Sequence, residues 1–270
     1  MAKTSRKKGR VTVKQMKFRN DPMIRLYEKT QDWLQERGRP LVIAIGIIAG
    51  LVVLYAAGHY YFQYRESKAA AAFSQALEKF NATVQDPSTP ATSPTIGKVY
   101  TDEQTKWQES ADAFEKLMND YSGYYGTIGR YYAGVSYLHL NNIQKGLDLL
   151  QQAAAKNEQP TSDLARLAMA EYYASANDPN PEVTQQNRQQ AITLYEQLLN
   201  SSVALKPAIQ VELGKLYEKN NQKEQAVAAY LEAAKFSRTA PAGQKAEERL
   251  KALAPDRLRE LPAPVTTPTP

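Results

Sequence analysis

The chain has 270 residues, of which 43% are hydrophobic and 23% are charged, and these ordinary values exclude a fibrous or wholly disordered protein. It contains no cysteine and only two histidines, His59 and His139, which excludes disulfides, thiolate zinc sites, a cysteine nucleophile and paired-histidine metal motifs. The net charge of +6 is unevenly distributed, because residues 1–40 carry twelve Lys or Arg against four Asp or Glu.

The basic segment, residues 1–40, ends in a predicted short amphipathic helix over residues 22–37. Asp21 can cap its first N–H groups and Pro22 suits the first helical position, while Gly38 and Pro40 predict its end. We expect this segment to contact anionic lipid headgroups, to which each Lys or Arg contributes about 1 kcal/mol. RNA or a cytoplasmic protein is the alternative partner.

Residues 41–62, LVIAIGIIAGLVVLYAAGHYYF, predict a transmembrane helix. No formal charge follows until Arg65, and roughly twenty residues at ~1.5 Å each cross a ~30 Å hydrocarbon layer. The excess of positive charge before the span predicts a cytoplasmic N-terminus, with the rest of the chain on the other side. A cleaved signal peptide with AAAA at 69–72 is the alternative, but the apolar run is too long and begins too late for one.

Three glycines of the predicted span share one helix face. Gly46 and Gly50 form a G-x-x-x-G motif and Gly58 lies two turns further on, so a second membrane helix could approach closely there. Glycine is also common in membrane helices without such a role. His59 lies near the interfacial end, where its ring can reach headgroups or water.

The remaining sequence predicts an all-α protein without strands. A helix over residues 63–84 continues from the anchor and is followed by a Pro/Ser/Thr linker over residues 85–104. Helical patterns then fill residues 105–254, and a Pro/Thr-rich tail over residues 255–270 is predicted to be disordered.

Small and aromatic residues recur at fixed offsets within residues 105–254. One copy has Ala133, Gly134, Tyr137, Gly146, Leu150 and Ala153, and another has Leu213, Gly214, Tyr217, Ala226, Tyr230 and Ala233. A weaker copy contains Met169, Ala170, Tyr173, Ala191, Tyr195 and Leu198, and Ser110, Phe114 and Leu117 indicate part of a fourth. We interpret the small residues as contacts between paired antiparallel helices and the aromatic residues as packing between successive pairs.

These offsets resemble the tetratricopeptide repeat, although Gln210 and Arg130 stand where that family usually has Trp. Together with the basic segment and the anchor, they resemble the bacterial ancillary SecYEG translocon subunits over roughly residues 20–253. The last repeat opens with Gly214-Lys215 rather than the Gly-Asp pair that is frequent in the family. The resemblance implies an inner-membrane protein with a tetratricopeptide-like α-solenoid in the periplasm, and it implies translocon subunits, nascent secreted chains and periplasmic chaperones as partners.

The resemblance also implies that residues of the first helix in each repeat line a peptide groove. The corresponding positions are Tyr131, Val135, Leu138 and His139, then Leu164, Leu167 and Glu171, and finally Val211, Lys215 and Glu218. Their mixture of apolar and Tyr side chains suits weak, sequence-tolerant binding of unfolded segments. The Lys and Asn set that clamps a C-terminal carboxylate in some relatives is missing, and apolar residues at these positions can also be buried between helices.

Two other classes of function are an enzyme and a structural scaffold. Nucleophile-elbow, P-loop and glycine-rich nucleotide motifs are missing from the sequence, so we expect neither an enzyme nor a cofactor. A structural scaffold in another cell-envelope complex stays open, because repeat arrays fix an architecture and leave the ligand undefined. A mitochondrial location is a minor variant, since the first twenty residues contain no acid.

Overall fold

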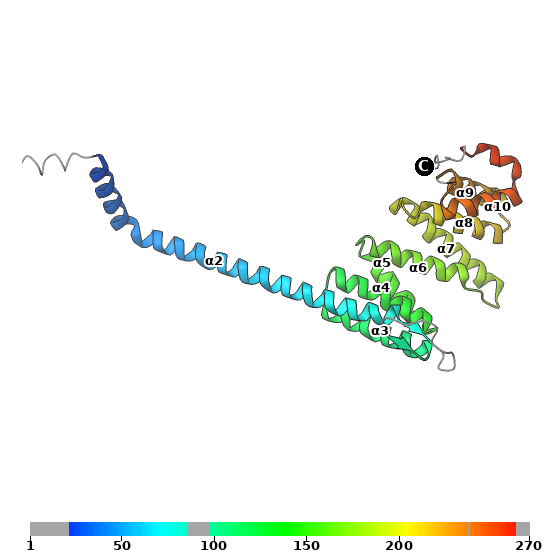
Figure 1. Cartoon of the computed structure of the whole chain (residues 1–270), viewed down its shortest axis with the longest axis horizontal. Helices are drawn as coiled ribbons and strands as arrows, with labels where there is room; N and C mark the ends of the chain where they lie inside the picture. Colours follow the sequence, from blue (N-terminus) through cyan, green and yellow to red (C-terminus); the bar gives the residue numbers. More distant parts are fainter. Residues whose placement is uncertain (1–21, 86–97, 237, 263–270) are drawn as a thin grey trace, which may run out of the picture. The chain divides into compact units, whose positions relative to one another are not determined.

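A computed structural model describes residues 22–85, 98–236 and 238–262, and the chain divides into two units, Met1–Ser67 and Lys68–Pro270. The elements in chain order are α2 (Pro22–Asn81), β1 (Thr83–Val84), β2 (Val99–Tyr100), α3 (Glu103–Asp120), α4 (Tyr124–His139), α5 (Ile143–Ala155), α6 (Thr161–Ser175), α7 (Pro181–Ser201), α8 (Lys206–Lys219), α9 (Lys223–Phe236), α10 (Pro241–Leu253) and the 3-10 helix η1 (Pro255–Glu260) (Figure 1).

Helix α2 is longer than the sequence predicted. The expected stop at Gly38 and Pro40 is wrong, because α2 continues through both residues to Asn81. A proline inside a helix removes one backbone hydrogen bond and usually bends the helix, and here the helix contains Pro40 without ending at it. The stretch Gly38–Asn81 is long and apolar enough to cross a membrane, and the side chains of its most apolar window are not buried within the structure.

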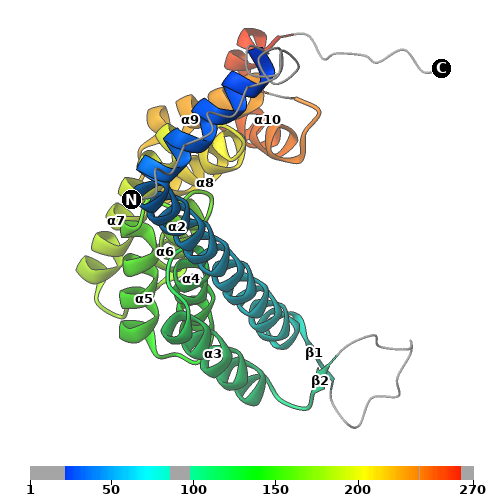
Figure 2. The same cartoon turned by 90° about the vertical axis from the view of Figure 1, so that its left-hand side faces the viewer.

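The second unit is built from helices that follow one another in space as they do in the chain. From α3 to α10, each helix packs mainly on the helices before and after it, as Figures 1 and 2 show. The core is divided accordingly into successive clusters. At one end, Phe73 and Phe80 from the last part of α2 pack on Phe114 of α3 and Tyr132 of α4.

Two helical hairpins, α4 with α5 and α8 with α9, share the same turn. Asn141 and Asn221 both adopt the left-handed conformation, with φ of 59° and 58°, which asparagine tolerates better than most residues. In both turns the next residue donates its backbone N–H to a tyrosine carbonyl, that of Tyr137 at 2.9 Å and that of Tyr217 at 2.8 Å. The duplication agrees with the sequence offsets.

The predicted small residues lie where the paired helices meet. A Cβ atom built on Gly134 would lie 2.9 Å from the carbonyl oxygen of Gly146, and one built on Gly214 would lie 2.6 Å from the ring of Tyr230. Ala226 is fully buried in the same core cluster as Tyr230. The interpretation of these positions as helix contacts is therefore confirmed.

The expectation of no strands is wrong for one short element. Within the described residues, β1 and β2 form a parallel pair in which Thr83 is opposite Val99 and Val84 is opposite Tyr100. Two residues are too few to produce an alternating pattern, so the sequence gives no signal for them. β1 lies just before the predicted linker of residues 85–104 and β2 lies within it, and residues 86–97 between them lie outside the described residues.

The predicted tail also begins later than expected. Pro255–Glu260 forms η1, and Leu261 after it is only 8% exposed because it packs on the core of α8, α9 and α10 together with Leu258. The rest of the tail, from residue 263, and the basic residues 1–21 with the Asp21 cap lie outside the described residues.

Candidate functional site

A groove between α6 and α8 collects three of the predicted site residues, Leu167, Glu171 and Lys215. Its volume is about 510 Å³. The apolar part of the lining comprises Leu167, Ala174, Leu205, Ala208, Ile209 and Leu216, with the buried Tyr195 from α7 behind them. We call this the α6–α8 groove, and it can accept apolar side chains from a partner.

Charged side chains complete the α6–α8 groove. Lys215 forms an ion pair with Glu212, one turn earlier on α8. Burial raises the pKa of Glu171, and the negative charge of Glu212 raises it further. Glu171 has no ion pair or hydrogen bond within the described parts of the chain, so its carboxylate is available to a partner's donor group.

The predicted residues of the first repeat lie in a different environment. Tyr131, Val135 and Leu138 are half-buried against the cluster of α5 and α6 that includes Leu150 and Met169. Burial raises the pKa of Tyr131 to about 12, with smaller effects from Tyr132 and Glu171. These side chains therefore mainly pack helices together. Leu164 of α6 is half-buried as well and does not line the α6–α8 groove.

His139 lies at the end of α4, where its ring stacks on Trp107 of α3 with centroids 3.8 Å apart. Both rings line a separate cavity of about 610 Å³ with Glu103 and Gln104. Partial burial lowers the pKa of His139. His139 therefore lies beside α3 and not in the groove that Leu167 lines, and its predicted role in binding stays a prediction.

Val211 and Glu218 do not line the α6–α8 groove either, although they share α8 with Lys215. Val211 is only 2% exposed and belongs to the core cluster of α9 and α10, so it cannot contact a partner in this structure. Glu218 accepts hydrogen bonds from Tyr230 at 2.6 Å and from Arg249. Burial alone would raise the pKa of Glu218, but the hydrogen bonds from Arg249 and Tyr230 outweigh it and lower that pKa.

A larger cleft, of about 710 Å³, was not anticipated from the sequence. It lies between α5 and α7 beside α6, and five glutamines line it: Gln151, Gln186, Gln189, Gln190 and Gln197. We call it the glutamine cleft. Four of the five lie on one side of α7, at the three- and four-residue spacing of a helix face. The same spacing is typical of an ordinary solvated face, so the sequence alone does not indicate a cleft.

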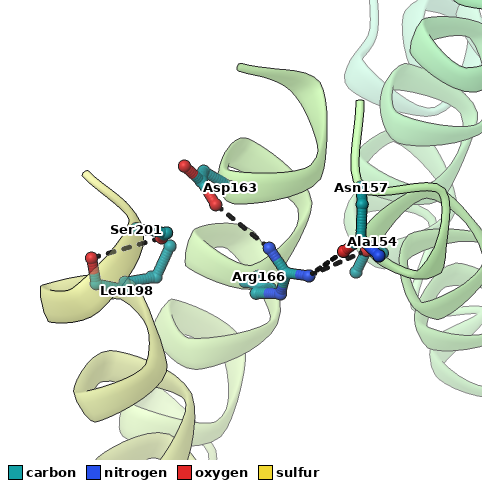
Figure 3. Close-up of polar contacts among 6 residues, drawn as sticks. All are labelled: Ala154, Asn157, Asp163, Arg166, Leu198 and Ser201. Carbon is teal, nitrogen blue, oxygen red and sulfur yellow. Dashed lines mark hydrogen bonds and ion pairs between the residues drawn. The ribbon is translucent and has the colours of Figure 1, made fainter. Parts of the chain in front are cut away.

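Arg166 of α6 lines the glutamine cleft at the side where α6 meets the end of α5. Its guanidinium donates hydrogen bonds to the buried carboxylate of Asp163, to the carbonyl of Ala154 and to the side chain of Asn157, each at 3.0 Å. Figure 3 shows this side chain reaching from α6 to the end of α5. The ion pair leaves this side of the cleft without net charge.

Gly46, Gly50 and Gly58 lie in α2, and a Cβ atom built on any of them would meet no described atom within 4 Å. That open surface is compatible with the predicted helix packing, which stays a prediction. No group of three or more His, Cys, Asp or Glu among the described residues could hold a metal ion. Comparisons with family models, with curated proteins and with solved structures found no match.

Proposed function

We propose that the chain is a membrane-anchored, non-catalytic interaction protein that binds unfolded polypeptide segments in the α6–α8 groove. In this proposal the apolar part of α2 spans the membrane, and α3 to α10 form a tetratricopeptide-like α-solenoid. The observation that carries the proposal is the groove, because it joins side chains from two successive hairpins on one accessible surface.

Two features of the second unit support a repeat architecture. Each helix packs mainly on its neighbours in the chain, as expected when a fold grows by adding hairpins. The Asn141 and Asn221 turns and the Gly134 and Gly214 contacts recur at corresponding positions in two hairpins. A stack of such units leaves the first helix of each hairpin free to contribute to a shared surface.

The chemistry of the α6–α8 groove favours loose recognition of a peptide. Leu167, Leu205 and Ala208 offer apolar surface to a side chain, while Glu171 and Lys215 carry opposite charges that can accept from and donate to a peptide backbone. Such a surface discriminates weakly among sequences. This suits an acceptor of many unfolded chains.

The proposed cellular role rests on the resemblance to ancillary translocon subunits and on the positive charge before the apolar helix. The basic segment before the apolar helix favours a cytoplasmic N-terminus, which would place the repeat unit on the far side of a bacterial inner membrane. There it would meet polypeptides leaving the SecYEG channel and pass them to periplasmic chaperones. We include this ancillary translocon role in the proposal.

Photocrosslinking of the full chain in lipid nanodiscs tests the groove. A benzoylphenylalanine at Leu167 is presented with a reduced, carboxymethylated polypeptide that stays unfolded, and separately with the folded, disulfide-bonded form of that polypeptide. We expect several-fold more crosslinking to the unfolded form. The control is the same probe at Glu232, an exposed position on α9 outside the groove.

Equal yields from the two positions, or equal yields from the folded and unfolded polypeptide, would refute binding in the groove. The cellular role is tested with the same Leu167 probe in cells that produce a stalled secretory chain. Crosslinks to the channel and to that chain support the translocon role. A single stoichiometric partner would instead indicate a scaffold in another envelope complex.

A further inference from the structure

The glutamine cleft lies apart from the α6–α8 groove. Helix α6 contributes Arg166, Met169 and Tyr173 to the cleft, whereas it contributes Leu167, Glu171 and Ala174 to the groove. Each set follows steps of three and four residues, so the two sets occupy different faces of one helix. A ligand in the cleft would therefore touch none of the residues proposed above for polypeptide binding.

The glutamine amides of the cleft are unused by the protein. None of the five makes a side-chain hydrogen bond to another described residue; Gln189 only accepts one from Thr193 through its backbone carbonyl. Each amide offers two N–H donors and one acceptor oxygen. The lining thus presents alternating donors and acceptors toward one space.

The cleft carries no net charge. Arg166 is the charged residue in its lining, and Asp163 neutralises it at 3.0 Å. The floor is apolar, formed by Leu147, Met169 and Leu194. An uncharged ligand with both polar and apolar groups fits this combination, whereas a charged one would be desolvated without a partner.

A second cavity extends the cleft beyond Arg166 and Gln197, which line both. It measures about 390 Å³. Ser162 lines it with a fully buried hydroxyl that has no hydrogen-bond partner in the described structure. Buried polar groups are nearly always paired, so this hydroxyl marks a place where a bound group can supply the missing partner.

Length also matches an extended peptide. Gln186 and Gln197 are eleven positions apart on α7, which is about 16 Å along a helix and roughly five residues of extended chain at ~3.3 Å each. A peptide backbone presents the donors and acceptors that glutamine amides complement. A sugar would instead need flat aromatic faces, and among the lining residues only Tyr173 is aromatic.

We infer that the glutamine cleft is a second polypeptide-binding site, specific for an extended, uncharged segment with small apolar side chains. The amides of α5 and α7 hydrogen-bond its backbone, and Leu147, Met169 and Leu194 accept its side chains. The chain therefore holds polypeptide on two faces of α6, one tolerant of charge and one that excludes it.

Calorimetric titration of the full chain in detergent micelles tests this site. The probe is an acetylated and amidated ten-residue peptide of Ala, Ser, Val and Gly, compared with versions in which two serines become Lys or Glu. We expect the neutral peptide to bind more tightly than both charged versions. The double variant Gln186→Ala with Gln190→Ala should weaken binding of the neutral peptide about tenfold, because each lost hydrogen bond is worth about two- to tenfold.

The matched control is Gln152→Ala with Gln185→Ala, which removes exposed glutamines of α5 and α7 that do not line the cleft. It should leave affinity within twofold. Thermal unfolding by circular dichroism checks that each variant is folded. Unchanged affinity in the folded cleft variant, absence of binding by the neutral peptide, tighter binding of a charged version, or binding of maltotriose instead of peptide would each overturn the inference.

Discussion

At the residue scale, the carboxylate of Glu109 on α3 makes polar contacts with three side chains near the linker. It accepts a hydrogen bond from Tyr100 at 2.8 Å, pairs with Lys98 and lies 3.4 Å from Lys79 of α2. One side chain thus joins the last part of α2, the strand β2 and α3. The segments before and after residues 86–97 are held together by this contact as well as by the strand pair.

Glu109 should make stability depend on pH below about 4.5. Hydrogen bonds from Lys98 and Tyr100 lower its pKa from 4.5 to about 2. A lowered folded pKa means that its contribution is complete above 4.5 and is lost as the pH falls toward 2. Because the side chain is 38% exposed, solvent screening keeps this contribution below about 1 kcal/mol.

Urea unfolding of Glu109→Gln and the unchanged chain at pH 6, 4, 3 and 2 measures this effect. We expect the variant to be less stable at pH 6 and the difference to shrink steadily as the pH falls from 4.5 to 2. Glu232→Gln serves as the control, because this exposed carboxylate pairs, among the described residues, only with Lys235 one turn away. A difference that stays constant from pH 6 to pH 2 would contradict the role of the Glu109 charge.

At the scale of elements, the hairpins were predictable because their packing is encoded locally. The offset from Gly214 to Tyr230 fixes which faces of α8 and α9 meet, and the structure places those two residues in contact. Helical periodicity also put Val211 and Lys215 near one face, but it could not say that α10 covers Val211. That information depends on a third helix, so the sequence could only suggest it.

Polar stripes were harder to interpret than apolar ones. The glutamines of α7 have the spacing of an exposed helix face, and sequence alone cannot show that α5 and α6 turn that face into one wall of a cleft. The position of His139 could not be predicted from the sequence for a similar reason, because its stacking partner Trp107 is distant in the chain. Both cases needed the arrangement of three helices.

Gly214→Ala should destabilise the second unit by about 1–3 kcal/mol, the usual cost of overpacking a core. The added methyl would lie 2.6 Å from the Tyr230 ring, which is fully buried and hydrogen-bonded to Glu218, so it has little room to move. Urea unfolding monitored by circular dichroism measures the loss. If the Tyr230→Leu background relieves the clash, the two changes together will cost less than their sum. Full additivity would argue against this contact.

At the scale of the whole molecule, an apolar helix follows a basic segment and precedes a unit with little net charge. Residues 1–40 have a balance of twelve positive to four negative side chains. The remainder of the chain therefore carries a slight negative excess. This asymmetry matches a protein that keeps its N-terminus at an anionic inner leaflet, and it makes orientation the property on which the proposed function most depends.

Single cysteines report that orientation directly, because the chain has none of its own. We expect a membrane-impermeant maleimide to label Gln225→Cys in intact bacterial spheroplasts and to label Gln31→Cys only after lysis, since the excess of positive charge before the span predicts a cytoplasmic N-terminal side. Both positions are exposed, so accessibility to the reagent depends on the membrane rather than on folding. The unchanged chain is the control for background labelling. Leu51→Arg, which costs about 2.5–3.5 kcal/mol at the centre of a span, should lower membrane insertion and so abolish the labelling of Gln225→Cys before lysis, because a chain that does not insert stays in the cytoplasm. Labelling of both cysteines before lysis would exclude the anchor, and the reverse pattern would place the α6–α8 groove in the cytoplasm, where it could not meet secreted polypeptides.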